Sequence, residues 1–192
     1  MNYLFHAYLS GENKDIVLGG FIADGVKGNQ LQHFNNDTIK GIRLHRRIDE
    51  FSNNHPSFIH SRKLIQSRYN GVFVDMYYDH FLAANWKEFS DIPLKRFTAE
   101  IYNYALKNFT ILPVKIKRLL FFMKSNDWLA SYADLKHLQV HFENLSKRAQ
   151  FVSGMENAVE TLELHYDLFE KDFRIFFSDV CDFSEKYLLE NP

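Results

Sequence analysis

Helix-breaking residues are scarce along this chain, and their scarcity limits the folds open to it. The 192 residues include only 4 prolines and 8 glycines, and five of the glycines precede Asn29. Long stretches then run without either residue, which favours long helices because proline and glycine most often end them. Apolar side chains recur there at spacings nearer 3.6 than 2, as on one face of an α-helix. The sequence therefore predicts an all-α, single-domain helical bundle over residues 1–192.

The expected helices are placed by these spacings and by capping residues. They cover residues 14–27, 38–51, 57–68, 72–89, 94–109, 113–126, 134–146 and 155–189. Asn36 and Asp37 are expected to cap the second of these helices, and Asn54 with Pro56 to begin the third. A hydrophobic content of 46% is enough for one core. We see no repeat, low-complexity tract or linker that would divide the chain.

Several classes of protein are disfavoured by composition. Cys181 is the single cysteine, so an internal disulfide is impossible. The opening MNYLFHAYLS lacks the pattern of a secretory signal, and the longest apolar runs fall far short of the roughly 20 residues that a membrane span needs. A net charge of -1 is not the basic excess typical of nucleic-acid-binding proteins. We therefore expect a cytoplasmic protein with no nucleic-acid or membrane partner.

The segment GIRLHRRIDEF carries the first candidate site residues. At 100° per residue its side chains separate into two arcs. One arc holds Ile42, His45, Ile48, Asp49 and Ser52, and the opposite arc holds Arg43, Arg46, Arg47 and Glu50. Burying an imidazole with a carboxylate is costly unless a partner or a metal ion binds them. His45 and Asp49 are therefore either a metal-binding pair or a structural hydrogen-bonded pair, and this helix alone leaves both open.

A second helix, within VFVDMYYDHFLAANW, places Asp75 and Asp79 on one side among apolar neighbours. Like charges at i, i+4 repel, so a divalent cation or an arginine is expected to balance them. His80 projects about 100° from Asp79, near enough to join a site between helices. A purely structural Asp75–arginine pair, with His80 at the margin of the core, is the alternative.

Two further candidates lie near the N-terminus. Asp24 ends the apolar segment IVLGGFIAD, where it either caps the next turn or joins a site, and the flanking glycines would allow Lys27 to meet a phosphate. His6, in YLFHAYL, is either a hydrogen-bonded core histidine or a ligand. Cys181 lies in an acidic stretch, which disfavours its thiolate and argues against a nucleophile.

Separate stretches of chain thus each place a His or Asp among apolar residues, which favours a metal site. Imidazoles mixed with carboxylates suit manganese, magnesium or iron better than a structural zinc, which usually binds cysteines. Such a metal activates water and stabilises charge on a transferring phosphoryl group. Motifs of other chemistries, GxSxG, GxxxxGK[ST] and GxGxxG, are absent from the sequence.

The same segments resemble a known family. NYLFHAYLS, GGFIADGVKGN, GIRLHRRIDEFSNNHP, VFVDMYYDHFLAANW and LHYDLFEKDF look like the acyl carrier protein phosphodiesterases. The likeness runs through most of the chain and is least distinctive over residues 94–146. That family is grouped with the HD-type metal phosphohydrolases, which are helical and use His and Asp ligands around a divalent metal. This chain differs from their signature, because HRRID separates His from Asp by three residues and the Asp79–His80 doublet runs in reverse order.

The resemblance implies hydrolysis of the phosphodiester between a carrier-protein serine and 4'-phosphopantetheine, with manganese or magnesium, to give apo acyl carrier protein. Carrier proteins of this kind are acidic, and residues 40–68 contain seven basic side chains against two acidic ones, whereas residues 160–190 contain nine acidic against three basic. A docking face would then include Arg43, Arg46, Arg47, Arg62, Lys63 and Arg68. A solvated charged face without a partner is the alternative.

The mechanism that we expect uses two groups of residues. The metal ligands, or carboxylates that support them, are His6, Asp24, His45, Asp49, Asp79 and His80, and the phosphate is neutralised by Arg46, Arg47 or Lys27. Two other hypotheses stay open. One is an HD-like phosphohydrolase that acts on a nucleotide or another small phosphodiester. The other is a non-catalytic helical binding module whose inward His and Asp groups pair internally.

Overall fold

The computed structural model describes residues 3–191, and their regular structure is entirely helical. The α-helices are α1 (Tyr3–Leu9), α2 (Lys14–Ile22), α3 (Asn36–Asn54), α4 (Pro56–Lys63), α5 (Asn70–Ala84), α6 (Trp86–Phe89), α7 (Leu94–Lys107), α8 (Val114–Ser125), α9 (Trp128–Ser131), α10 (Leu135–Ser146), α11 (Ala158–Leu164) and α12 (Tyr166–Glu190). Short 3-10 turns are η1 (Ala23–Gly25), η2 (Gly28–His33), η3 (Phe109–Ile111) and η4 (Met155–Asn157). The all-α prediction is confirmed for this part of the chain.

Local capping shifts several predicted boundaries. α3 begins earlier than predicted because Asn35 is its N-cap, accepting a hydrogen bond from the Thr38 amide. α4 is capped by His55, not by Asn54, with Pro56 in its first turn as predicted. The helix predicted over 155–189 is two helices, because the backbone of His165 leaves the helical region at φ -124° and ψ 26°. The helix predicted over 14–27 stops at Ile22, where the chain tightens into η1.

α2 and α3 cross in backbone contact, and glycines permit the contact. A Cβ added to Gly19 would lie 2.2 Å from the Thr38 carbonyl oxygen, and one added to Gly41 would lie 2.0 Å from the Ile16 carbonyl oxygen. Neither position can accept a side chain without moving a backbone. This close crossing brings the end of α2, and the η1 turn after it, alongside the middle of α3.

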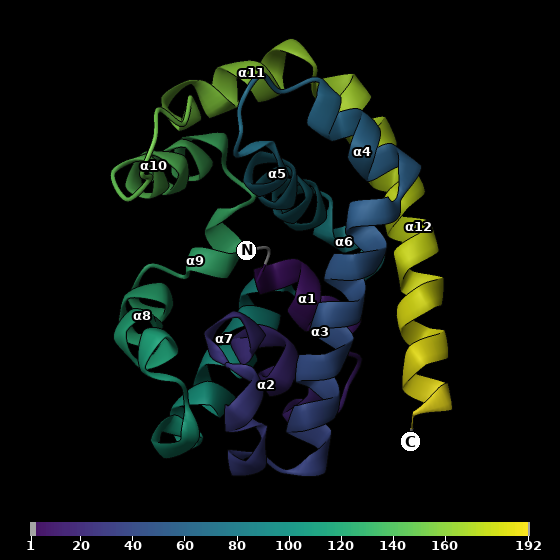
Figure 1. The fold of residues 1–192 in the computed structure, drawn as a ribbon, viewed down its shortest axis with the longest axis vertical. Coiled ribbons are helices and arrows are strands. Elements are labelled where there is room, and N and C mark those ends of the chain that lie inside the picture. The colour runs from purple at the N-terminus through teal and green to yellow at the C-terminus, as the bar shows by residue number, and fades with distance from the viewer. Residues whose placement is uncertain (1–2, 192) are drawn as a thin grey trace.

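The helices surround one continuous apolar core. Buried residues from the first helix to the last belong to a single cluster, and its largest members are aromatic, including Tyr77, Phe81 and Phe173. Figure 1 shows α1, α2 and α3 grouped in the lower half, with α12 along one edge and α8 on the opposite side. Among residues 3–191, no helix has the length and apolar character needed to cross a membrane.

The basic α3 and the acidic α12 lie side by side. Lys40 Nζ donates to the Leu188 carbonyl at 2.9 Å, and His55, just after α3, lies 3.0 Å from Asp179 on α12. The basic and acidic stretches of the chain are therefore in direct contact.

Candidate metal centre

Four predicted site residues converge where α1, η1 and α3 meet. His6 Nε2 lies 3.2 Å from Asp49 Oδ1, and His45 Nε2 lies 3.5 Å from both Asp49 Oδ2 and Asp24 Oδ1. The two imidazole rings stack with their centroids 3.5 Å apart. Ligand atoms of His6, His45 and Asp49 all fall within 4.8 Å of one another, close enough for one cation to contact all three.

A backbone carbonyl sets the orientation of His45. Its Nδ1 donates to the Gly20 carbonyl oxygen at 2.9 Å, so Nε2 keeps its lone pair and faces the two carboxylates. A histidine that binds a metal through one nitrogen usually donates the other N–H in this way. Gly20 reaches this position because α2 and α3 cross so closely, which connects the glycine pair to the geometry of the centre.

His6 is buried without hydrogen bonds. Neither of its ring nitrogens has a hydrogen-bond partner among residues 3–191, although Nε2 lies close to Asp49. Burial, and then the neighbouring His45, hold the pKa of His6 well below its ordinary value, so the ring is neutral. A buried imidazole left unpaired carries an energetic penalty that a bound cation would remove. The residues therefore fit a divalent metal ion.

The carboxylates of the centre differ in environment. Burial alone would raise the pKa of Asp24, but the contact with His45 and the charge of Lys115 hold the pKa below its ordinary value, so this group stays ionised. Asp49 is half exposed, at 50% of its side chain, and desolvation raises its pKa. The prediction that Asp49 faces inward is therefore wrong in part, because its oxygens reach the histidines from the solvent edge.

Asp79 occupies a different position from the one predicted. It is fully buried, and its Oδ1 accepts a hydrogen bond from the Phe5 amide at 2.8 Å. Desolvation raises the pKa of this carboxyl well above its ordinary value. Asp79 thus lies beneath the first turn of α1, bonded to the residue that precedes His6, but outside the compact group of ligand atoms. Desolvation, and to a smaller extent the charges of Asp49 and Asp24, raise the pKa of Asp75.

The structure does not bring His80 into the group. Its Nδ1 donates to the Tyr132 carbonyl at 2.8 Å, and its Nε2 accepts from the Tyr166 hydroxyl at 3.1 Å. Both ring nitrogens are satisfied by protein atoms, so no lone pair is left for an ion. The prediction that His80 is a ligand is corrected for this reason. His80 follows Asp79 by one residue, about 100° around the helix, and so lies on another side of α5, toward α9 and α12.

The predicted phosphate-binding residues differ in whether another part of the protein holds their side chains. Arg46 donates to the Val26 carbonyl at 3.2 Å, which holds it against the loop that carries Asp24. Arg47 pairs with Glu50 on the solvent side of α3. Lys27 is exposed. Of the remaining docking residues, Arg62 donates a hydrogen bond to Asn70 and Arg68 lies over the ring of Phe151, so neighbouring side chains hold both in place.

Three features of the centre were missed by sequence reasoning. The Gly20 carbonyl carries no side-chain signal, and the nearness of Lys115 depends on the packing of α8 against η1, which no local spacing encodes. Asp75, which a cation or an arginine was expected to balance, was left out of the predicted ligands. In contrast, the prediction that the thiolate of Cys181 is disfavoured agrees with the structure, because burial, with Glu185 and Asp182, raises the pKa of its thiol to about 12.

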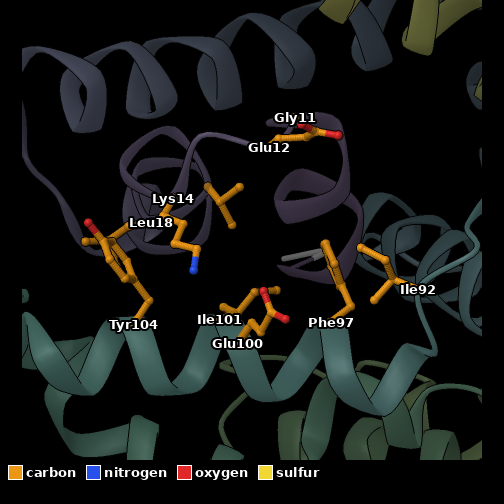
Figure 2. A pocket seen from close by; sticks show the side chains of 10 residues that line it. Gly11, Glu12, Lys14, Leu18, Ile92, Phe97, Glu100, Ile101 and Tyr104 are labelled. Atoms are coloured by element: carbon orange, nitrogen blue, oxygen red, sulfur yellow. The ribbon is translucent and has the colours of Figure 1, made fainter.

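The chain also has an apolar pocket of 240 Å³ between α2 and α7. Lys14 and Leu18 reach toward it from α2, and Phe97, Glu100 and Ile101 from α7, as Figure 2 shows. None of His6, Asp24, His45 and Asp49 lines it. The pocket is therefore separate from the centre.

An all-helical fold with two stacked histidines and an adjacent carboxylate defines a helical protein with a group of residues that could hold a metal ion. Comparison with known proteins is more specific. The family described as acyl carrier protein phosphodiesterase matches residues 1–180. Proteins of that name from Photorhabdus laumondii subsp. laumondii and Escherichia coli O6:H1 are 29% and 31% identical to this chain, over 96% and 95% of it and 96% of each relative.

The chain belongs to the acyl carrier protein phosphodiesterase family, and is a hydrolase of phosphodiester bonds. The resemblance inferred from the sequence motifs is thereby confirmed. No solved structure matches the chain, so its predicted likeness to the HD-type fold stays a prediction.

Proposed function

We propose that this protein hydrolyses the phosphodiester between 4'-phosphopantetheine and the serine of holo acyl carrier protein, with a divalent cation held by His6, His45 and Asp49. The relatives named above carry the substrate class in their name. The observation that carries the choice of metal site is the buried, stacked pair of histidines, of which His6 has no hydrogen-bond partner among the described residues. A mixed imidazole and carboxylate donor set suits Mn²⁺ or Mg²⁺.

The chain's own residues then have distinct tasks. The Gly20 carbonyl keeps His45 in the tautomer that leaves Nε2 as a donor atom. Asp24 stays ionised beside His45, where it can support the cation or accept a proton from attacking water. Arg46 donates to the carbonyl of Val26, two residues after Asp24, and we assign it to the phosphate. When bound, the cation would lower the pKa of water and stabilise charge on the phosphoryl group.

Mass spectrometry of the carrier protein tests the proposal directly. Holo acyl carrier protein is incubated with the enzyme in Mn²⁺, in Mg²⁺ and in excess chelator. We expect loss of the phosphopantetheine mass with either metal and an intact holo protein with chelator. Turnover that persists undiminished after complete chelation would remove the metal from the proposal, and no mass loss in any condition would remove the substrate.

A further inference from the structure

α8 has an outward face that is both apolar and basic. Its buried side chains, Ile116, Leu120 and Met123, follow one helical stripe toward the core. On the opposite side lie Val114, Lys115, Arg118, Phe121 and Phe122, which we call the α8 face. Val114, Phe121 and Phe122 are 63%, 58% and 51% exposed. Large apolar side chains gathered on a solvent face commonly mark an interaction surface.

The charge of α8 is one-sided. The helix contains four basic residues and no acidic one, in a chain of net charge -1. Lys117 is used internally, since its Nζ donates to the Thr110 carbonyl. Arg118 has no hydrogen bond or ion pair with any of residues 3–191, in contrast to Arg47 and Arg62 of the docking face predicted from the sequence. The α8 face therefore offers unpaired positive charge next to exposed aromatic rings.

The α8 face also adjoins the candidate metal centre. The start of α8 packs on η1 through its buried side: a Cβ added to Gly25, the residue after Asp24, would lie 3.0 Å from side-chain atoms of both Pro113 and Ile116. Lys115 extends from the same turn of α8, and Phe121 follows it by six residues, about 9 Å along the helix axis. The α8 face is turned away from this contact and borders the centre at Lys115, whose charge acts on Asp24.

We propose that the α8 face is the docking surface for the acidic carrier-protein substrate. The inference rests on the proposed function, because that function requires a macromolecular substrate whose modified serine is delivered to the centre. Charge complementarity favours an acidic partner, and the exposed rings provide apolar contacts at the middle of the interface. An anionic membrane would also attract such a face. Lys115, at the edge of the α8 face that borders Asp24, favours the substrate protein.

Kinetics with holo acyl carrier protein test the assignment. The variants Arg118→Glu and Phe121→Ser are compared with Lys186→Glu and Leu189→Ser, matched changes at exposed positions near the end of α12, on the other side of the molecule in Figure 1. We expect each α8 variant to raise KM about tenfold with little change in kcat, as loss of a docking contact does. The effect of Arg118→Glu should shrink as salt increases. The α12 variants should match the wild type.

Binding of apo acyl carrier protein, measured by calorimetry, separates this inference from the proposed function because it needs no turnover. Wild-type binding that the α8 changes weaken would support docking even if no phosphopantetheine were released. Active wild type with unchanged KM and Kd in the α8 variants would overturn docking alone. Two other outcomes would also overturn docking. The α8 variants would bind carrier protein as the wild type does, but they would either no longer attach to phosphatidylglycerol vesicles or, in ultracentrifugation, no longer form a dimer that the wild type forms.

Discussion

Two regions of this protein bury histidines under opposite conditions. In the metal centre, His6 has no hydrogen-bond partner among the described residues, and His45 uses only one nitrogen for a backbone carbonyl. Between α5, α9 and α12, His80 has both nitrogens satisfied by Tyr132 and Tyr166. Burial is similar in the two places. The difference lies in unsatisfied donor atoms, which identify the region prepared for an ion more reliably than the presence of histidine does.

The strongest test of this difference is removal of the centre's own groups. His45→Ala and Asp49→Ala should each lower kcat/KM for holo acyl carrier protein roughly 1,000-fold or more, about 4 kcal/mol of transition-state stabilisation. Circular dichroism should show the helical fold intact. His137→Ala is the matched control, because His137 also lies beside an aspartate, at 3.5 Å from Asp134, but on the solvent side of α10. Near-wild-type activity in both centre variants would refute the assignment.

Low pH should destabilise the folded protein through His141, a hydrogen-bonded histidine outside the metal centre. His141 stacks on Trp128 and bonds Ser131, and desolvation lowers the pKa of His141 to about 4 from an ordinary value of 6.5. Between these values the unfolded chain binds more protons, so the free energy of unfolding falls as pH falls through this window, by up to about 3 kcal/mol. Urea unfolding of the wild type and of His141→Phe at several pH values measures this.

The Phe variant keeps a ring against Trp128 but cannot titrate. Its free energy of unfolding should therefore fall less steeply than that of the wild type between pH 6.5 and 4. Parallel curves for the two proteins would mean that His141 titrates normally in the folded state.

Metal addition should distinguish the two regions in the absence of substrate. Mn²⁺ at 100 times its Kd should stabilise the folded protein by about 2.7 kcal/mol, because it binds the native state alone. His6→Asn should lose most of this gain, whereas His80→Phe should keep it. The measurement is the shift of the unfolding midpoint with and without Mn²⁺. An equal gain in both variants would place the ion elsewhere.

Helix content was predictable from the sequence because it depends on local properties. The scarcity of glycine and proline and the 3.6-residue spacing are visible in any short window. The division at His165 and the short α9 were missed, since neither carries a proline or a glycine at the break. Their positions depend on how neighbouring helices pack, which propensity alone does not encode.

The candidate site was predictable in part for a related reason. The i, i+4 spacing correctly paired His45 with Asp49, because both lie on one helix. The same reasoning grouped Asp79 and His80 with them. It failed there because the partners of these two residues, Phe5 and Tyr132, lie 74 and 52 residues away in sequence. A helical wheel gives a side chain's direction about its own axis, but not which element is packed there.

The smallest expected effect concerns His80, the histidine whose two ring nitrogens are hydrogen-bonded, and tests the second of the two regions. His80→Phe keeps a ring in the core but leaves the Tyr132 carbonyl and the Tyr166 hydroxyl without their partner, at a cost of roughly 2 kcal/mol in the free energy of unfolding. Because these bonds join α5 to α9 and α12 and do not touch the centre, kcat/KM of the folded protein should stay within about twofold of the wild type. Chemical denaturation and steady-state kinetics on the same preparation measure both quantities. A large loss of activity without loss of stability would return His80 to the reaction and erase the distinction between the two regions.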